Sequence, residues 1–179
     1  LLGNPQEPFS FIIVESSDEN LRSSFEKIGW HLADQIDYKS ISTAFKLGFL
    51  NKPYSTAPMT PYFWNTYVND FGFQKPTEVN SVRSRHHARI WKTNFVTDSG
   101  ESVYVGIISL DTGVKWWGIT HKIAPDIDTE REMLFEELDQ AGLIRKFEKE
   151  KFVKTVLGKN FTGDQFYTDG NIYIIFLKS

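Results

Sequence analysis

The chain has 179 residues, of which 40% are hydrophobic and 24% charged, and its formal net charge is -3 at pH 7. This mildly acidic balance argues against nucleic-acid binding through overall charge. The absence of cysteine excludes disulfides, thiolate nucleophiles and Cys-ligated zinc. No apolar run approaches the roughly 20 residues that span a bilayer. Because the chain opens on LLGNPQEP without an initiator Met, we expect a piece of a longer protein, from which an upstream anchor could have been cut away.

The first part of the chain alternates a strand with helices. Residues 9–16 form a short run rich in aromatic and β-branched side chains, which predicts a strand. Ser17 can cap a following helix, whose apolar residues recur at helical spacing until Gly29 ends it. Residues 40–50 predict a second, shorter helix.

The middle of the chain favours strands. Two prolines predict that residues 54–65 form an extended loop that runs into a strand, and residues 71–82 are predicted to be another loop. Residues 85–96 alternate in strand fashion. The turn sequence TDSGES and the apolar run VYVGIISLD follow, so that this region predicts a hairpin. A third strand is expected within KWWGITHKI.

The last part of the chain contains the clearest helical pattern. DIDTEREMLFEELDQAGL, from residue 126 to 143, predicts a helix capped by Asp128 or Thr129. Strands are predicted at 151–157 and 171–178, with a polar loop between them. Together the elements predict one α+β domain over residues 1–179, with a mainly antiparallel sheet flanked by two to three helices.

Positive and titratable side chains gather in RSRHHARIW, residues 83–91. Alternation along a strand places Arg83, Arg85, His87, Arg89 and Trp91 on one face, and His86, Ala88 and Ile90 on the other. Because His86 and His87 point to opposite faces, we do not expect them to clamp a metal together, and no metal ligand or cofactor is assigned.

The basic face has two interpretations. Arg85 and Arg89 offer fork-shaped donors that suit a phosphate or carboxylate, and His87 between them titrates near neutral pH. This predicts a site for an anionic ligand. The alternative is a solvated outer face, on which the arginines pair with nearby Asp and Glu.

Further candidates lie in three separate stretches. His121 is followed by Asp126 and Arg131 in THKIAPDIDTERE, where a histidine near a carboxylate suits general base chemistry but the acids also suit helix capping. Asp111 follows an apolar strand, where it is either a functional carboxylate or a turn former. Asp164 lies in TGDQFYTDG, whose glycines predict turns and whose spacing does not match a calcium loop.

Several stretches together resemble the LssY C-terminal domain family. They are GWHLAD, APMTPYF, RHHARIW, VGIISLDTGV, THKIAPDIDTERE and TGDQFYTDG, in the same order over nearly the whole chain. Members of that family are often attached to membrane regions similar to DedA proteins or phosphatidic-acid-phosphatase-type enzymes, which implies a bacterial domain tethered beside a membrane by a segment outside this chain. The family has no established activity, and the segment DTGVKWWGI is shorter here than is usual in it.

Three functional hypotheses follow. The first is a membrane-tethered binding module that holds an anionic ligand or lipid headgroup on Arg85, His87 and Arg89, with Arg131 and Asp164 as further contacts. The second is a hydrolase of phosphate or related esters, with His87 or His121 as general acid or base and one of Asp111, Asp126 or Asp164 as orienting group or metal ligand. The third is a structural or interaction domain whose polar residues form buried networks.

Overall fold

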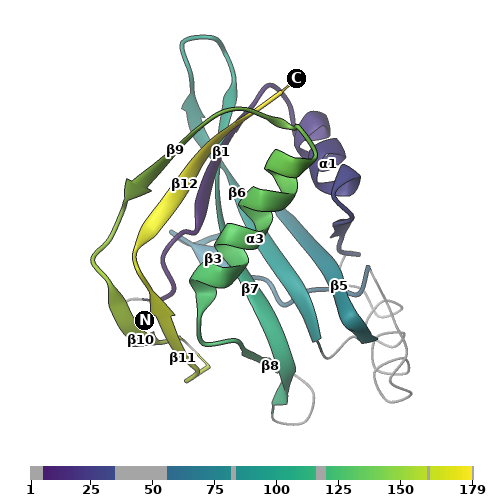
Figure 1. The fold of residues 1–179 in the computed structure, drawn as a ribbon, viewed down its shortest axis with the longest axis vertical. Coiled ribbons are helices and arrows are strands. Elements are labelled where there is room, and N and C mark those ends of the chain that lie inside the picture. The colour runs from purple at the N-terminus through teal and green to yellow at the C-terminus, as the bar shows by residue number, and fades with distance from the viewer. Residues whose placement is uncertain (1–5, 35–55, 82–83, 116–119, 161, 179) are drawn as a thin grey trace.

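The computed structural model describes residues 6–34, 56–81, 84–115, 120–160 and 162–178, and for residues 79–81, 114–115 and 120–121 it describes the backbone alone. Eight strands form one sheet in the order β2-β5-β6-β7-β1-β12-β9, with β8 paired to β7 (Figure 1). The strands are β1 (Phe11–Glu15), β2 (His31–Leu32), β5 (Phe71–Ser81), β6 (Ser84–Val96), β7 (Ser102–Lys115), β8 (Thr120–Ile123), β9 (Ile144–Lys151) and β12 (Asn171–Leu177). All neighbours are antiparallel except β1 and β12. The predicted mainly antiparallel α+β architecture is confirmed.

Two small hairpins lie outside this sheet. One pairs β3 (Phe63–Trp64) with β4 (Tyr67–Val68), and the other pairs β10 (Val156–Lys159) with β11 (Gln165–Thr168). Each is a two-stranded unit, so that its stability depends on contacts with the rest of the molecule.

Two helices are present in the described residues, α1 (Asp18–Lys27) and α3 (Ile127–Gln140). The Ser17 hydroxyl accepts a hydrogen bond from the Asn20 amide, which confirms the predicted cap of α1. The predicted cap of α3 is wrong, because Asp126 holds that position and accepts from the Asp128 amide. The helix predicted at residues 40–50 lies outside the described residues. Within them, neither helix is long and apolar enough to cross a membrane.

Both helices cover the same face of the sheet, and α3 crosses it obliquely in Figure 1. The apolar core lies between them and that face. Its largest fully buried members are Trp30, Tyr104, Phe11, Phe25, Phe73, Ile13, Leu21, Ile90, Leu134, Leu138 and Ile175. On β6, the side chains that point to this core are Ala88 and Ile90. The residues between them in sequence must therefore face the opposite side.

Two loop predictions and one strand prediction are wrong. Residues 71–81 form β5 rather than a loop, because Pro76 falls where the pairing with β6 loses register and so removes little of the ladder. The strand predicted at 151–157 overlaps the end of β9 and the start of β10, and residues 152–155 connect the two strands. The polar loop predicted before the last strand contains β11.

The middle hairpin is confirmed but extends further than predicted. Strand β7 continues beyond Asp111 to Lys115, with a register shift between Asp111 and Gly113 in its pairing with β8. Asp111 therefore lies inside a strand rather than at its end. The irregularity next to it allows β8 to add to the edge of the sheet beside this carboxylate.

Candidate functional site

The basic residues of β6 lie on the face of the sheet that the helices leave uncovered. Arg85, His87 and Arg89 retain only 5%, 2% and 7% of their accessible surface. Their predicted common face is confirmed, and the alternative of a solvated outer face is wrong. Instead of pairing with water, these side chains face polar groups from other strands and from the loops that cover them. Buried charges persist in proteins only when such partners are supplied.

His86 points to the opposite side, as the alternation predicts. Its Nδ1 atom lies 2.7 Å from Glu130 Oε2 on α3, and its ring lies 6.3 Å from that of Trp30. The two adjacent histidines therefore belong to different environments. In the described part of the chain, no group of three or more His, Asp or Glu side chains is arranged to hold a metal ion.

Two of the basic residues are held by groups on the neighbouring strands. Arg85 Nη1 donates to the Gln74 Oε1 atom of β5, and Gln74 in turn donates to the carbonyl of Ala57. Burial lowers the pKa of Arg85, and the charge of Asp111 opposes this shift. His87 Nδ1 lies 3.3 Å from Asp111 Oδ2, and both side chains are buried. Arg85, His87 and Asp111 thus form one electrostatically coupled group between β6 and β7.

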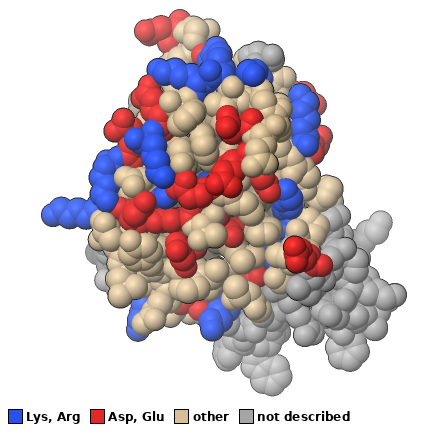
Figure 2. Space-filling view, viewed as in Figure 1, with Lys and Arg blue, Asp and Glu red and all other residues tan. Residues whose placement is uncertain are grey.

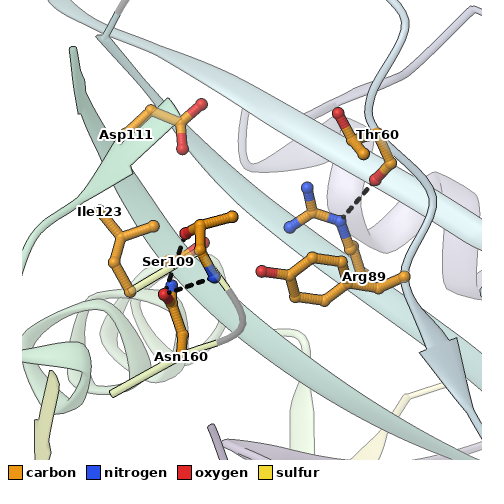
Figure 3. Close-up of a pocket in the computed structure, with 8 residues that line it drawn as sticks. Thr60, Arg89, Ser109, Asp111, Ile123 and Asn160 are labelled. Carbon is orange, nitrogen blue, oxygen red and sulfur yellow. Dashed lines mark hydrogen bonds between the residues drawn. The ribbon is translucent and has the colours of Figure 1, made fainter. Parts of the chain in front are cut away.

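Arg89 is held differently from its neighbours. Its Nε atom donates to the carbonyl of Thr60 at 3.1 Å, and its guanidinium carbon lies 4.2 Å from the centre of the Tyr62 ring. The terminal nitrogens have no hydrogen-bond partner among the described residues, and Figure 3 shows them directed into a pocket. The backbone contact and the ring fix the plane of the guanidinium, so that its paired donors are oriented before any ligand arrives.

The pocket has a volume of about 50 Å³ and a mixed polar lining. Its walls are Thr60, Tyr62, Arg89, Ser109, Asp111, Ile123, Asn160 and Thr162. At roughly 10–15 Å³ for each water molecule, this space accommodates about three to five of them. It suits one small polar group rather than a whole drug-sized ligand, for which pockets of roughly 300–1,000 Å³ are typical.

One edge of the pocket is a tight loop after β10. The Asn160 Oδ1 atom accepts hydrogen bonds from the amides of Thr162 and Asp164, at 3.1 and 2.8 Å. The Asn160 Nδ2 atom donates to Glu7 Oε1 at 3.0 Å, which joins this loop to the N-terminal segment. Burial raises the pKa of Glu7, and burial together with the charge of Glu7 raises the pKa of Tyr62 to about 12.

The family model for the LssY C-terminus matches residues 1–172. The chain belongs to the LssY C-terminal family. Comparisons with curated proteins and with solved structures returned no match. Membership is therefore established for nearly the whole chain.

The structure brings together five of the eight predicted site residues. Arg89 and Asp111 line the pocket, and Arg85, His87 and Asp164 lie buried close behind or beside its walls. His121 belongs to β8, opposite Val114, but its side chain lies outside the described residues. Its predicted role as acid or base stays a prediction.

Asp126 and Arg131 do not line the pocket. Asp126 is the N-cap of α3. Arg131 bonds to Asp128, Glu132 and Asp169 at 2.6–2.9 Å, in a network that ties α3 to the segment before β12. Burial would lower the pKa of Arg131, but these hydrogen bonds outweigh it and raise the pKa. The geometry therefore supports a structural role for Arg131 and a capping role for Asp126, not the ligand-binding and catalytic roles expected for them.

Sequence reasoning missed most of the pocket wall. Thr60, Tyr62, Ser109, Asn160 and Thr162 were not among the candidates, although all of them line it. Ser109 could have been predicted, because alternation along VGIISLD places it on the same face as Asp111. It stands directly opposite His87 in the β6–β7 ladder. The loop residues had no such signal, because their position depends on long-range contacts.

The pocket can therefore offer three kinds of contact to a ligand. Arg89 supplies a fixed positive charge with two donors, and Ser109, Thr162, Tyr62 and Asn160 supply hydroxyl and amide groups. Asp111 supplies a buried carboxylate acceptor, whose Oδ2 atom lies 3.3 Å from His87 Nδ1. A small anionic group that also carries a hydroxyl would satisfy all three.

Proposed function

We propose that this domain binds the phosphate group of a phosphate monoester, and that Arg89 is its principal contact. The observation that carries the proposal is the orientation of Arg89, whose terminal nitrogens face the pocket while Thr60 and Tyr62 hold the rest of the guanidinium. A planar fork of two donors matches two oxygens of a phosphate.

The lining favours a phosphate monoester over a bare anion. Asp111 lies on the pocket wall, and a ligand made only of acceptor oxygens would meet its carboxylate without a proton between them. The second pKa of a phosphate monoester is about 6, so part of the ligand keeps a hydroxyl on the phosphate near neutral pH. That hydroxyl can donate to Asp111 while the remaining phosphate oxygens accept from Arg89, Ser109 and Asn160.

The size of the pocket limits what enters it. A volume of about 50 Å³ accommodates a phosphate group but leaves the rest of the ligand outside. The proposal therefore concerns a headgroup or a terminal phosphate and not a whole nucleotide or sugar. From the resemblance to membrane-attached members of the family we also propose that the domain works beside a bacterial membrane, tethered by a segment outside this chain.

Calorimetric titration with glycerol 3-phosphate tests this proposal. We expect Arg89→Lys to weaken binding about tenfold to a hundredfold, because hydrogen bonds to charged groups are worth roughly 1.5–3 kcal/mol. Arg145→Lys is the matched control, since its side chain is half exposed on β9. Equal affinity of wild type and Arg89→Lys would refute the proposed contact. Absence of binding in the folded wild-type protein would favour a purely structural domain.

A second candidate function is hydrolysis of such a monoester. The observation that favours it is the 3.3 Å contact between His87 Nδ1 and Asp111 Oδ2, because a histidine oriented by a carboxylate suits general acid or base chemistry. Arg89 would then stabilise charge that develops on the phosphate. We rank hydrolysis second because His87 is buried and is not part of the pocket wall.

Hydrolysis is tested by phosphate release from p-nitrophenyl phosphate and glycerol 3-phosphate. An enzyme would lose turnover in Asp111→Asn while Arg145→Lys stayed active. A folded wild-type protein that binds glycerol 3-phosphate but releases no phosphate from it, with or without added divalent metal, would exclude this candidate and leave the binding function intact.

A further inference from the structure

The β3–β4 hairpin presents large apolar side chains to solvent. Phe63 and Tyr67 are each 70% exposed, Trp64 is 38% exposed and Val68 is 47% exposed. The two turn residues, Asn65 and Thr66, have positive φ angles of 48° and 72°, as in the tight turns of β-hairpins with two-residue loops. Clustered apolar exposure of this kind marks an interaction site more often than isolated exposed residues do.

A second exposed segment lies next to the hairpin. The Phe9 ring lies 5.3 Å from that of Trp64 and 6.4 Å from that of Phe152, which is 52% exposed. Phe152 is flanked by the exposed lysines Lys151 and Lys154, in a stretch from 151 to 159 that contains three lysines and no acidic residue. We call residues 63–68 and 151–154 together the aromatic–lysine surface.

The hairpin of this surface is joined directly to the pocket wall along the chain. The hairpin follows directly after Tyr62, which lines the pocket and exchanges hydrogen bonds with Asn69 at 3.0 and 3.1 Å. Trp91, on the same face of β6 as Arg89, donates through Nε1 to the carbonyl of Tyr67 at 3.1 Å. The backbone that supports the exposed aromatics is therefore fixed by the same strand and loop that position Arg89.

Helix α3, on the other face of the sheet from the pocket, carries the opposite charge. Helix α3 contains six acidic residues and one arginine within IDTEREMLFEELDQ. Figure 2 shows a broad band of acidic atoms across this side. An anionic surface would therefore be repelled by the α3 side and attracted by the lysines that flank Phe152.

We infer that the aromatic–lysine surface docks on an anionic phospholipid bilayer, and that the pocket then takes the phosphate monoester of a lipid headgroup. This inference rests on the proposed function and names the source of its ligand. Phe, Trp and Tyr side chains at a hairpin tip suit the membrane interface, because their rings are apolar while the indole and phenol groups keep polar contacts. Lysines beside them meet lipid phosphates.

A bilayer fits this surface better than a second copy of the chain. The exposed parts of the four hairpin side chains amount to on the order of 400–500 Å², judged from typical side-chain areas. A stable protein interface needs roughly 800 Å² from each partner and a complementary shape. A bilayer requires no such complementarity, and two or three inserted aromatics with a few lysines are sufficient for reversible attachment.

Vesicle co-sedimentation with the whole chain tests the inference. The vesicles contain phosphatidylcholine alone, phosphatidylcholine with phosphatidylserine, or phosphatidylcholine with phosphatidic acid, whose headgroup is a phosphate monoester. We expect binding to increase in that order. The double variant Phe63→Ser/Tyr67→Ser should bind at least about tenfold more weakly to all anionic vesicles, because it removes the two most exposed rings.

Phe95→Ser is the matched control for the double variant. Phe95 is 73% exposed but lies near the end of β6, in the hairpin that joins it to β7, and not on the aromatic–lysine surface. It should leave vesicle binding unchanged. Because all three replaced side chains are exposed, each variant should keep the wild-type melting temperature. Arg89→Lys should still bind phosphatidylserine vesicles but lose the preference for phosphatidic acid.

The possible failures are distinguishable. If wild type binds glycerol 3-phosphate in solution but no vesicle, the docking inference is overturned and the proposed function stands. If vesicles bind equally with phosphatidylserine and phosphatidic acid, and glycerol 3-phosphate does not bind, the proposed function fails and with it the headgroup role of the pocket. If the double variant keeps full vesicle binding, or instead abolishes a wild-type dimer seen by light scattering, the bilayer is the wrong occupant.

Discussion

Strand β6 contributes apolar side chains to one face of the sheet and charged side chains to the other. Ala88 and Ile90 pack into the core beneath the helices, whereas Arg85, His87 and Arg89 are equally buried on the far side. Folding needs the first set, since burial of apolar surface is its main driving force. The second set costs desolvation energy. Charges buried at such a cost are more readily explained by a site than by stability.

Substitutions in the core beneath the helices should lower the free energy of unfolding the most. Phe25 is fully buried and stacks on Phe73 with ring centres 4.5 Å apart. We expect Phe25→Ala to lower the free energy of unfolding by about 3–5 kcal/mol, because it removes packing and leaves a cavity. Urea unfolding measures this change. Phe95→Ala, at an exposed site, should cost less than about 0.5 kcal/mol.

Substitutions on the polar face of β6 and β7 should change the free energy of unfolding non-additively, because the charges there interact. Asp111→Ala is expected to destabilise the protein by about 3 kcal/mol, because it leaves Arg85 and His87 buried without their carboxylate. Adding Arg85→Met to this variant should recover part of the loss, since one uncompensated charge is then absent. A double-mutant cycle by urea unfolding measures the coupling. Strictly additive effects would contradict the electrostatic group described above.

Two carboxyl groups should give stability opposite dependences on pH. Glu7, beside the pocket, has a folded-state pKa raised above the usual 4.5 by burial, so its contribution is full below that value and is lost as the pH rises through the raised pKa. Asp169 has a pKa below the usual 3.8, because hydrogen bonds from Arg131 outweigh its burial. Its contribution is present above 3.8 and is lost as the pH falls toward the lowered pKa.

Thermal unfolding as a function of pH tests this contrast. Glu7→Gln should reduce the decline in melting temperature above about pH 4.5, and Asp169→Asn should reduce the decline below about pH 4, relative to wild type. These are the smallest effects expected, since both side chains are partly accessible to solvent. Profiles parallel to that of wild type would show that neither carboxyl group changes its pKa on folding.

The sequence was informative where one strand determines the geometry. Alternation along residues 85–91 correctly separated His86 from His87 and placed the arginines on one face. It could not show that this face is buried, because the cover comes from Glu7, Thr60 and Asn160, which are far apart in the chain. The local pattern around Pro76 predicted a loop, since a proline usually ends a strand, and only the pairing with β6 shows otherwise.

The same contrast between local sequence patterns and long-range contacts applies to the candidate site. Arg89 and Asp111 were identified from local chemistry, and the structure places both on the pocket wall. Arg131 has equally suggestive neighbours in sequence, but its partner Asp169 is 38 residues away and ties it to a different part of the molecule. Residue type and spacing therefore suggested the candidate residues. Long-range contacts, which the sequence does not show, determine which of them share a pocket.

The most direct test of the central claim is a crystal structure of the domain with glycerol 3-phosphate bound. We predict that the phosphate lies in the pocket, with two of its oxygens within hydrogen-bond distance of the terminal nitrogens of Arg89 and a third phosphate oxygen near Asp111. A phosphate bound elsewhere on the molecule, with the Arg89 guanidinium turned onto a protein carboxylate, would contradict it.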